Sequence, residues 1–336
     1  MSQKEILPES ENPRREFMQK SLLGASAFAG LSVATTSHAK VDNPQKSLEP
    51  EVINEVDILV VGSGSAGTTA AIQAGRAGAK TLLMERNSQL GGTTTTGGVA
   101  YPGLFDAWGK QVISGIGWEL VKESVELDGG KFPDFSKVPR VHHHNQIHIN
   151  QFLYSILAEE KCQEAGVEIA YYEFPTALTQ TENGWQVDCM GFGTKRRVIC
   201  KQIVDCTGGA EVVGLLGLER LRGEERQPGS YLFKIGDPHN PASSQLRRLY
   251  VHGADSTNSR TVTLANLTGR KTILSRVRNS KERLMHLQPE TGFRESFRII
   301  GDTVITVQDY TSGRHFEDAV SYAFYPVDLH TRTGAV

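Results

Sequence analysis

The sequence predicts an α/β fold, in which a parallel sheet with helices forms one domain and an inserted, partly β domain follows it. Three segments carry this prediction. VDILVV (56–61) and KTLLME (80–85) are continuous apolar runs of the kind that forms strands buried on both faces of a parallel sheet. Between them, AGTTAAIQAGRAG (66–78) is rich in alanine and ends at a glycine, which is typical of a helix. The 336 residues allow about two domains of ordinary size.

The composition excludes some classes of protein and draws attention to one region. With 36 Lys+Arg against 38 Asp+Glu, the net charge of −2 gives no electrostatic footprint for nucleic acid or for an anionic membrane. The hydrophobic fraction of 38% is that of a globular chain rather than a disordered one. Of the 34 glycines, 15 lie between Gly62 and Gly130, so the backbone there is under local conformational demands.

The first 39 residues have the pattern of a signal peptide. Arg14 and Arg15 precede a 14-residue apolar run (21–34), and the small residues Ser37 and Ala39 flank a cleavage site. The run is shorter than the roughly 20 apolar residues that span a bilayer, so no stable membrane span is expected. The paired arginines resemble the twin-arginine consensus, which predicts export of the folded protein to the periplasm by the twin-arginine machinery. A disordered tail or an amphipathic helix is the alternative, and residues 40–55 are predicted to be an exposed linker.

A GxGxxG motif connects the first predicted strand to its helix. Gly62 permits the tight turn, Gly64 lets the backbone approach a pyrophosphate, and Gly67 lets the helix pack close to the strand. The free N–H groups at the helix start, at Ser65 and Ala66, are placed to bind phosphate oxygens. The motif therefore predicts a Rossmann-type site for a dinucleotide.

Glu85 closes the second strand 23 residues after Gly62, where a carboxylate accepts hydrogen bonds from ribose hydroxyls of either NAD or FAD. The segment ERNSQLGGTTTTGGVAYPG (85–103) resembles the FAD-dependent oxidoreductase family related to the fumarate reductase flavoproteins and the heterodisulfide reductase flavin subunit. In that family the ribose-binding Glu precedes a basic residue and a Gly-Gly-rich loop that lies against the flavin and the pyrophosphate. The matching positions are Glu85, Arg86, Gly91, Gly92 and Thr93. The resemblance implies FAD as the cofactor, and an NAD-dependent dehydrogenase is the alternative.

Two later segments share the resemblance. KQIVDCTGGAEVVGLLG (201–217) is similar to the family's strand that ends in Ala-Thr-Gly, and Thr207 and Gly208 match the positions where the backbone passes beside FAD. Cys206 stands in place of the usual Ala, and residues 209–211 differ from the common Asp-Gly-Asp. Residues 293–334 are similar to the family's connection from cap to core, with matches at Arg294, Glu295, Arg298, Asp309, Asp318, Asp328 and His330.

Four of these matches are candidates for catalysis. Arg294 and Arg298 share a face whether the segment is a strand or a helix, and a cation there holds a substrate carboxylate or oxyanion. His330, positioned by Asp328 on the same strand face, is expected to take a proton as hydride leaves the substrate. The alternative is that these charges form a surface Arg–Asp network or pack at strand ends.

The middle of the chain carries no clear chemical motif. Its spacing predicts a helix over 148–166, one or two strands over 167–181 and a hairpin over 184–197. The resemblance implies that Ala177 or Leu178 contacts the adenine. The run HHHNQIH (142–148) lacks the spacing of a zinc site and is interpreted as a polar loop without a metal. Cys189 and Cys200 form either a disulfide across the hairpin or two buried thiols.

The sequence therefore predicts an exported FAD-dependent oxidoreductase, with an FAD-binding domain over 56–217 and a cap over 218–336. A small organic substrate would pass hydride to the flavin, and the electrons would go on to an acceptor that the sequence does not name. In the family, a last strand and a Gly-rich helix return to the FAD domain, so the end at Val336 predicts a C-terminal truncation. The alternative is a truncated or degenerate remnant that binds FAD weakly or not at all.

Overall fold

The computed structural model describes residues 50, 52–139, 142–224, 227–280, 282–294, 296–321, 330–331 and 334–335. The predicted signal peptide (1–39), Glu295 and Asp328 lie outside the described residues. The first strand, β1, runs over Val52–Val61, so the last four residues of the predicted linker (40–55) belong to the sheet. The strand begins this early because its neighbour β8 (Thr194–Asp205) is long enough to pair with it from the start: Arg196 of β8 pairs with Val52.

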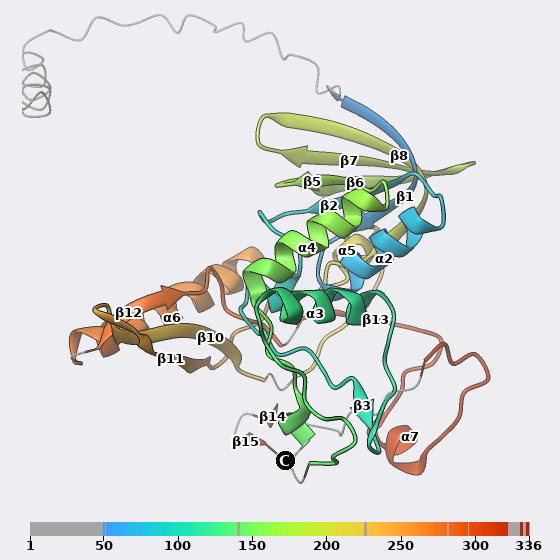
Figure 1. Ribbon diagram of the computed structural model, residues 1–336. Helices are drawn as coiled ribbons and strands as arrows, with labels where there is room; N and C mark the ends of the chain where they lie inside the picture. The colour runs from blue at the N-terminus through green and yellow to red at the C-terminus, as the bar shows by residue number, and fades with distance from the viewer. Residues whose placement is uncertain are drawn as a thin grey trace, which may run out of the picture. The chain divides into compact units, whose positions relative to one another are not determined.

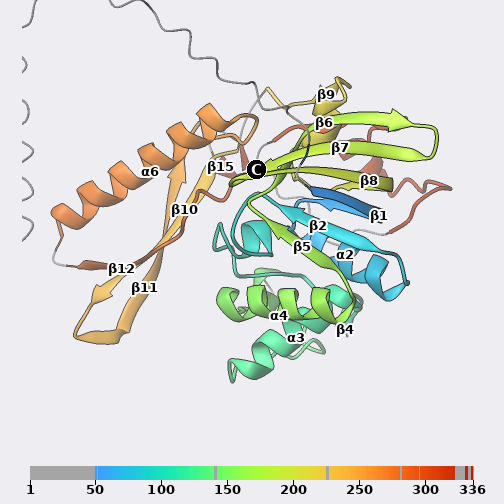
Figure 2. The same ribbon diagram turned by 90° about the horizontal axis from the view of Figure 1, so that it is seen from above.

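A six-stranded sheet forms the larger part of the fold, and its order is β5-β2-β1-β8-β7-β6 (Figures 1 and 2). The strands β5 (Glu168–Tyr171), β2 (Thr81–Glu85), β1 and β8 run parallel to their neighbours. The hairpin of β6 (Phe174–Thr181) and β7 (Gly184–Gly191) continues the sheet in antiparallel fashion. The α/β fold class is confirmed, and so are the strands and the hairpin predicted over 167–197.

Each face of this sheet has its own apolar core. On one face lie α2 (Ser65–Arg76), α3 (Ile116–Leu127) and α4 (Gln151–Glu164), as Figures 1 and 2 show. Val60 and Leu83 of the sheet are buried against these helices. On the other face, Leu59 and Leu82 are buried with Val187 of β7. Strands covered on both faces account for the unbroken apolar runs of β1 and β2.

The segment predicted as a cap contains a three-stranded antiparallel sheet with one long helix. The strands are β11 (Asn240–Val251), β10 (Gly229–Asp237) and β12 (Arg283–Leu287), in that order, and α6 (Ser259–Arg278) packs on them. Tyr231 is fully buried in their core. A Cβ on Gly269 of α6 would stand 2.5 Å from the Tyr231 ring, so the glycine lets the helix lie directly on it.

Short elements connect these parts. They are η1 (Gly92–Thr94), β3 (Asp106–Ala107), β4 (Lys110–Gln111), η2 (His142–Asn145), α5 (Glu211–Leu215), β9 (Arg220–Leu221), β13 (Arg298–Ile299), α7 (Val307–Ser312), β14 (His330–Thr331) and β15 (Gly334–Ala335). Within the described ranges, no helix is both long enough and apolar enough to cross a membrane.

The thiols of the hairpin are buried and free. Cys189 stands opposite Arg196, and Cys200 stands opposite Trp185, so the two cysteines belong to different rows of the β7–β8 ladder. Of the two expectations for this pair, the structure therefore has two buried thiols. Burial raises the pKa of Cys189 to about 12 and that of Cys200 to about 11.

Candidate dinucleotide site

Two glycines of the turn after β1, Gly62 and Gly67, have little room for any other residue. Gly62 has φ +90°, and a Cβ there would lie 2.5 Å from the carbonyl oxygen of Cys206. A Cβ on Gly67 would lie only 1.7 Å from the carbonyl oxygen of Gly62. The tight turn and the close helix packing that the motif predicted are therefore both present.

The start of α2 is open to an anion. Its N-cap residue is Gly64, no side chain caps the helix, and its first turn holds no acidic residue. The first N–H groups of a helix have no partner within the helix, and the helix dipole adds positive potential there. A Cβ on Gly64 would meet no atom within 4 Å, and Gly64 lines a cavity of about 180 Å³. This open space beside free N–H groups fits a phosphate.

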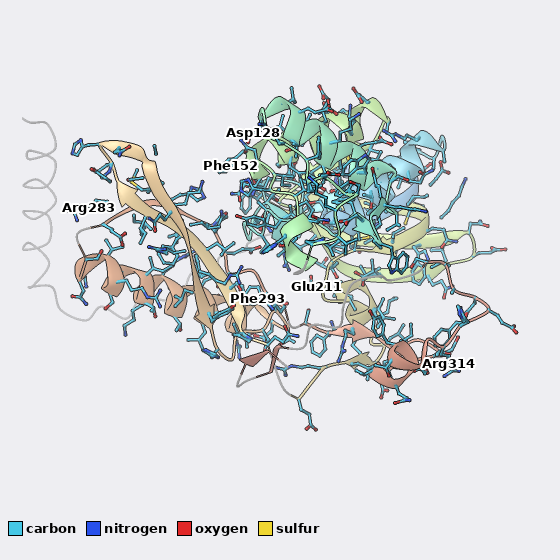
Figure 3. All side chains as sticks on the ribbon, turned by 60° about the horizontal axis from the view of Figure 1, so that its bottom comes forward. Asp128, Phe152, Glu211, Arg283, Phe293 and Arg314 are labelled. Atoms are coloured by element: carbon cyan, nitrogen blue, oxygen red, sulfur yellow. The ribbon has the colours of Figure 1, made fainter. Side chains whose placement is uncertain are left out.

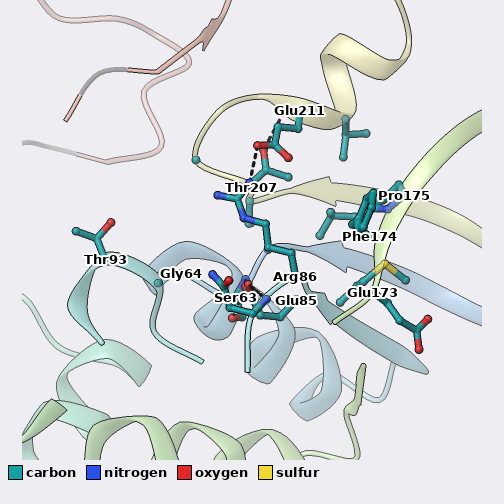
Figure 4. A pocket seen from close by; sticks show the side chains of 18 of the residues that line it. Ser63, Gly64, Glu85, Arg86, Thr93, Glu173, Phe174, Pro175, Thr207 and Glu211 are labelled. Carbon is teal, nitrogen blue, oxygen red and sulfur yellow. Dashed lines mark hydrogen bonds and ion pairs between the residues drawn. The ribbon is translucent and has the colours of Figure 1, made fainter. Parts of the chain in front are cut away.

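Glu85 lies at the end of β2 and is only 6% exposed. Its Oε2 accepts hydrogen bonds from the backbone N–H of Ser63 (2.8 Å) and from Ser63 Oγ (2.6 Å), and its Oε1 accepts one from the N–H of Asn87 (2.8 Å) (Figure 4). A carboxylate has about four acceptor positions, so one stays available to a ribose hydroxyl. The three bonds hold the carboxylate against the glycine turn.

A second loop lies against the same turn. A Cβ on Gly92 would stand 2.8 Å from the Cα of Gly64, so the loop backbone touches the turn directly. Gly91 has φ +104° and leads into η1, the short helix that contains Thr93. Arg86 points across the cavity to Glu211 of α5, with Nη1 2.9 Å from Oε1 (Figure 4).

The end of β8 closes another side of the cavity. Asp205 accepts hydrogen bonds from the N–H and the hydroxyl of Thr207, at 3.1 and 2.7 Å, and its other oxygen accepts one from the N–H of Val212. The Thr207 hydroxyl in turn accepts the N–H of Glu211 at 2.9 Å. Asp205 thus fixes the turn that presents Thr207 and Gly208 to the cavity.

Most of the residues predicted to bind the cofactor line this one cavity. They are Gly62, Gly64, Glu85, Arg86, Gly92, Thr93, Thr207 and Gly208. The remaining predictions, Ser65, Ala66, Gly67 and Gly91, lie next to these in the same turns but do not line the cavity. Phe174 and Pro175 line it where Ala177 or Leu178 was expected. Neither Ala177 nor Leu178 lines the cavity, and the side chain of Leu178 packs against the core on one face of the sheet.

Sequence reasoning missed Ser63, Asp205 and Glu290. Ser63 is a variable position of the GxGxxG motif, and Asp205 lies two residues before Thr207, which matches the family. Both residues therefore lie within or next to motifs that the sequence shows. Glu290 follows β12 and lines the cavity from a distant part of the chain, which no local pattern predicts. Burial raises the pKa of Glu290, the Arg86 charge opposes that rise, and the nearby Glu85 adds to it.

The two arginines predicted to be catalytic lie away from this cavity. Arg294 is exposed, and its Nη1 donates to the side chain of Gln227 at 3.3 Å. Arg298 is exposed in β13, opposite Leu221. Neither arginine lines the cavity, and they share no regular element, so the common face expected for them is not formed. The backbone of His330 pairs with Ala335, and its proposed partner Asp328 lies outside the described residues.

Other charges of that segment have structural partners. Asp309 closes a capping box with Thr306 at the start of α7 and also accepts a hydrogen bond from Arg314 at 2.8 Å. The Arg314–Asp309 pair involves none of the four candidate catalytic residues. Near the histidine run, the ring of His148 packs on Tyr101, with centroids 4.9 Å apart. The described residues contain no group of three or more His, Cys, Asp or Glu side chains arranged around a metal ion.

Comparison with known proteins gives short matches to curated sequences. A pseudooxynicotine dehydrogenase of Pseudomonas sp is 39% identical over 88 residues, which are 25% of this chain and 17% of that protein. A thiamine thiazole synthase of Methanococcus vannielii is 44% identical over 50 residues, 15% of this chain and 19% of that protein. This chain therefore spans less than a fifth of the length of these relatives. The structure of the flavin-dependent monooxygenase PieE in complex with FAD and substrate has a TM-score of 0.47, at 13% identity, over 74% of this chain and 51% of that one.

A model of the family described as FAD dependent oxidoreductase matches residues 57–266 and 247–335. The two ranges take in every segment that lines the cavity, from the turn after β1 to Glu290. The match also extends through the three-stranded sheet and α6 to the end of the described chain. The chain therefore belongs to the FAD-dependent oxidoreductase family, and its cofactor is FAD.

Proposed function

We propose that FAD binds with its phosphates at the Gly62–Gly64 turn and that the chain acts as an exported FAD-dependent oxidoreductase of the fumarate reductase and heterodisulfide reductase type. One observation carries the proposal: the uncapped start of α2, where Gly64 leaves open space beside free N–H groups. Glu85 supports it, because its carboxylate is fixed at the end of the next strand with an acceptor position free.

The chain's own groups would hold the cofactor in three ways. The N–H groups of Ser65, Ala66 and Gly67 donate to phosphate oxygens, and Glu85 accepts from the ribose. The loop at Gly92 and the turn at Thr207 and Gly208 enclose the same space.

The proposed reaction oxidises a small organic substrate. When bound, FAD would supply the chemistry that takes up a hydride from a C–H bond of the substrate, and an electron acceptor would then receive the electrons. The proton from the substrate goes to a base, for which His330, positioned by Asp328, remains the candidate. Arg294 and Arg298 remain candidates for a substrate anion on the strength of the family resemblance. The short match to a pseudooxynicotine dehydrogenase supports dehydrogenase chemistry.

The visible spectrum of the full chain, expressed in the cytoplasm and purified, tests the proposal. We expect a yellow protein that carries FAD in stoichiometric amount and is bleached by a substrate under anaerobic conditions. A colourless protein whose extract contains no flavin would refute the FAD-binding role, as expected of a degenerate remnant. A colourless protein that reduces added NAD would point to the NAD-dependent alternative.

Export through the twin-arginine route is a separate part of the proposal. It rests on Arg14 and Arg15 before the short apolar run at 21–34. Replacement of both arginines by lysine keeps the charge but removes the paired arginines, so we expect the flavoprotein to accumulate in the cytoplasm. Equal periplasmic amounts of the variant and the original chain would refute this route.

A further inference from the structure

A buried arginine, Arg196 of β8, lies behind one wall of the dinucleotide cavity. Its side chain is 13% exposed, and that of its partner Glu173 is 10% exposed. Glu173 lines the cavity just before β6 begins at Phe174, and its carboxylate is directed away from Glu85 (Figure 4). By contrast, Arg314 on the outlying α7 (Figure 3) is 57% exposed. Exposed pairs contribute little, so the buried pair is the one that can hold a defined geometry.

All three nitrogens of the Arg196 guanidinium are engaged. Nε donates to Oε2 of Glu173 at 2.7 Å and Nη2 donates to Oε1 at 3.1 Å, so the pair is bidentate. Nη1 donates to Oδ1 of Asn54 at 2.6 Å and to Oε1 of Glu168 at 3.1 Å. Asn54 belongs to β1 and Glu168 to β5. The guanidinium is therefore fixed by three strands, and its bidentate edge gives the Glu173 carboxylate a single position.

The chain around Glu173 has little freedom. Only Tyr172 and Glu173 connect the end of β5 to the start of β6. Tyr172 has φ +58°, a conformation that residues other than glycine rarely adopt. A Cβ on Gly191 would stand 2.7 Å from Cγ of Glu173, so the glycine leaves the space through which Glu173 reaches Arg196. Because the connection is so short, the position of the Glu173 carboxylate decides where β6 begins.

The start of β6 adjoins the position expected for the ribose. The backbone N–H of Glu173 donates to the backbone carbonyl of Glu85 at 3.3 Å. In the proposed function the Glu85 carboxylate accepts from the ribose, and adenine is bonded to that ribose. The lining beside Glu85 is apolar and includes Phe174 and Pro175 of β6 and Val212 of α5. A wall with an aromatic ring suits the face of a purine base.

We propose that Arg196 is a positioning residue for the adenine end of FAD. Through Glu173 it holds Phe174 and Pro175 against the face of the adenine ring, and it does not itself touch the cofactor. The inference rests on the proposed function for the identity of the ligand, and it assigns Arg196 no part in the redox step. Its effect is confined to the adenosine half of FAD, so it extends equally to ADP, which carries that half without the flavin.

Calorimetric titration of the full, flavin-free chain with FAD and with ADP tests the inference in Arg196→Lys, Phe174→Ala and the double variant. Lysine keeps a positive charge beside Glu173, but its single nitrogen cannot form the bidentate pair. We expect each single variant to raise the Kd of both ligands about tenfold, the value of one lost base–aromatic contact. Because Arg196 acts through the wall, the double variant should lose far less than the roughly hundredfold of two independent effects.

The neighbouring residue on β8 provides a matched control. Arg197 forms its own bidentate pair with Asp188, at 2.7 and 3.3 Å, and neither residue lines the cavity. Arg197→Lys should therefore leave both Kd values unchanged. Urea unfolding of each variant reports stability separately from binding. Should Arg196→Lys fail to fold, Glu173→Gln takes its place in the double-variant comparison, because glutamine keeps the size of the side chain and accepts from one of the two Arg196 donors.

Unchanged affinities in Arg196→Lys would overturn the proposal, and so would an equal loss in Arg197→Lys. A fully additive loss in the double variant would show that Arg196 does not act through Phe174. A loss for FAD without one for ADP would place the effect at the flavin end and would also overturn it. Failure of the proposed function is visible separately, as an original chain that binds no FAD. If that chain still binds ADP, the ADP titrations decide the role of Arg196, and if it binds neither ligand both proposals are refuted.

Discussion

Two alanine substitutions in the same turn should have opposite consequences. Gly67→Ala places a Cβ 1.7 Å from the carbonyl oxygen of Gly62, a distance that must open to at least 3.0 Å. Gly64→Ala places a Cβ where no atom lies within 4 Å, and its φ of −60° and ψ of −175° are open to alanine. The first change should therefore disturb folding, and the second should disturb the cofactor.

The magnitudes follow from these contacts. Overpacking costs about 1–3 kcal/mol, and since the Gly67 clash is with backbone rather than a flexible side chain, we expect about 3 kcal/mol. At an N-cap, alanine is worse than glycine by about 0.5–1 kcal/mol, so Gly64→Ala should remain folded. A methyl group at Gly64 keeps phosphate oxygens from reaching the N–H groups at about 3 Å, and we expect FAD affinity to fall about tenfold or more.

Both variants are measured in two assays. Urea unfolding of the flavin-free proteins reports stability, and titration of the same proteins with FAD reports affinity. Gly67→Ala should unfold at a lower urea concentration than the original chain, whereas Gly64→Ala should unfold near the original midpoint and bind FAD weakly. Unchanged FAD affinity in Gly64→Ala would refute the placement of the phosphates. Unchanged stability in Gly67→Ala would refute the close contact of helix and turn.

Three further predictions concern buried polar groups. Glu85→Gln places an amide NH₂ group where the carboxylate now accepts hydrogen bonds from backbone N–H groups. The free energy of unfolding in urea should therefore fall by about 3 kcal/mol. An unchanged urea midpoint would contradict these hydrogen bonds. Burial opposes ionisation of Asp255, but hydrogen bonds from Thr257 and the charge of Arg222 outweigh it and hold its pKa at about 2. Since this lies below the unfolded value of about 4, the stabilisation is present above pH 4 and is lost as the pH falls towards 2. In the Asp255→Asn variant, the free energy of unfolding should therefore depend less on pH between pH 4 and pH 2 than in the original chain. The same pH dependence in both proteins would contradict the lowered pKa of Asp255. Cys189, whose pKa burial raises to about 12, should resist alkylation at neutral pH until urea is added, and labelling of the native protein would show an accessible thiol.

The sequence was sufficient for features that depend on local physics. Strand, turn and helix around Gly62 were predictable, because an apolar run, a glycine at positive φ and an alanine-rich segment each favour one local conformation. The end of β2 at Glu85 followed from the same pattern. The match between the loop at Gly92 and a known family indicated the cofactor, although nothing in the loop's own composition specifies its contact with Gly64.

The contacts between distant segments could not be predicted in this way. The turn that Asp205 holds at the end of β8, and the pairing of β8 with Val52, both depend on which strands lie side by side. The spacing of apolar residues within one segment does not determine which strand it pairs with. The predicted common face for Arg294 and Arg298 failed because the first lies outside any strand or helix and the second in a two-residue strand.

The sequence by itself therefore determined the α/β fold, the glycine turn after β1 and the acidic residue beside it, since each follows from residues close together in the chain. Only the tertiary structure decided what surrounds them. It brings Glu290 from beyond β12 to the cavity and aligns Lys234 with His286 across two strands. The physical reason is that burial and strand register, rather than sequence spacing, decide which distant side chains share one space.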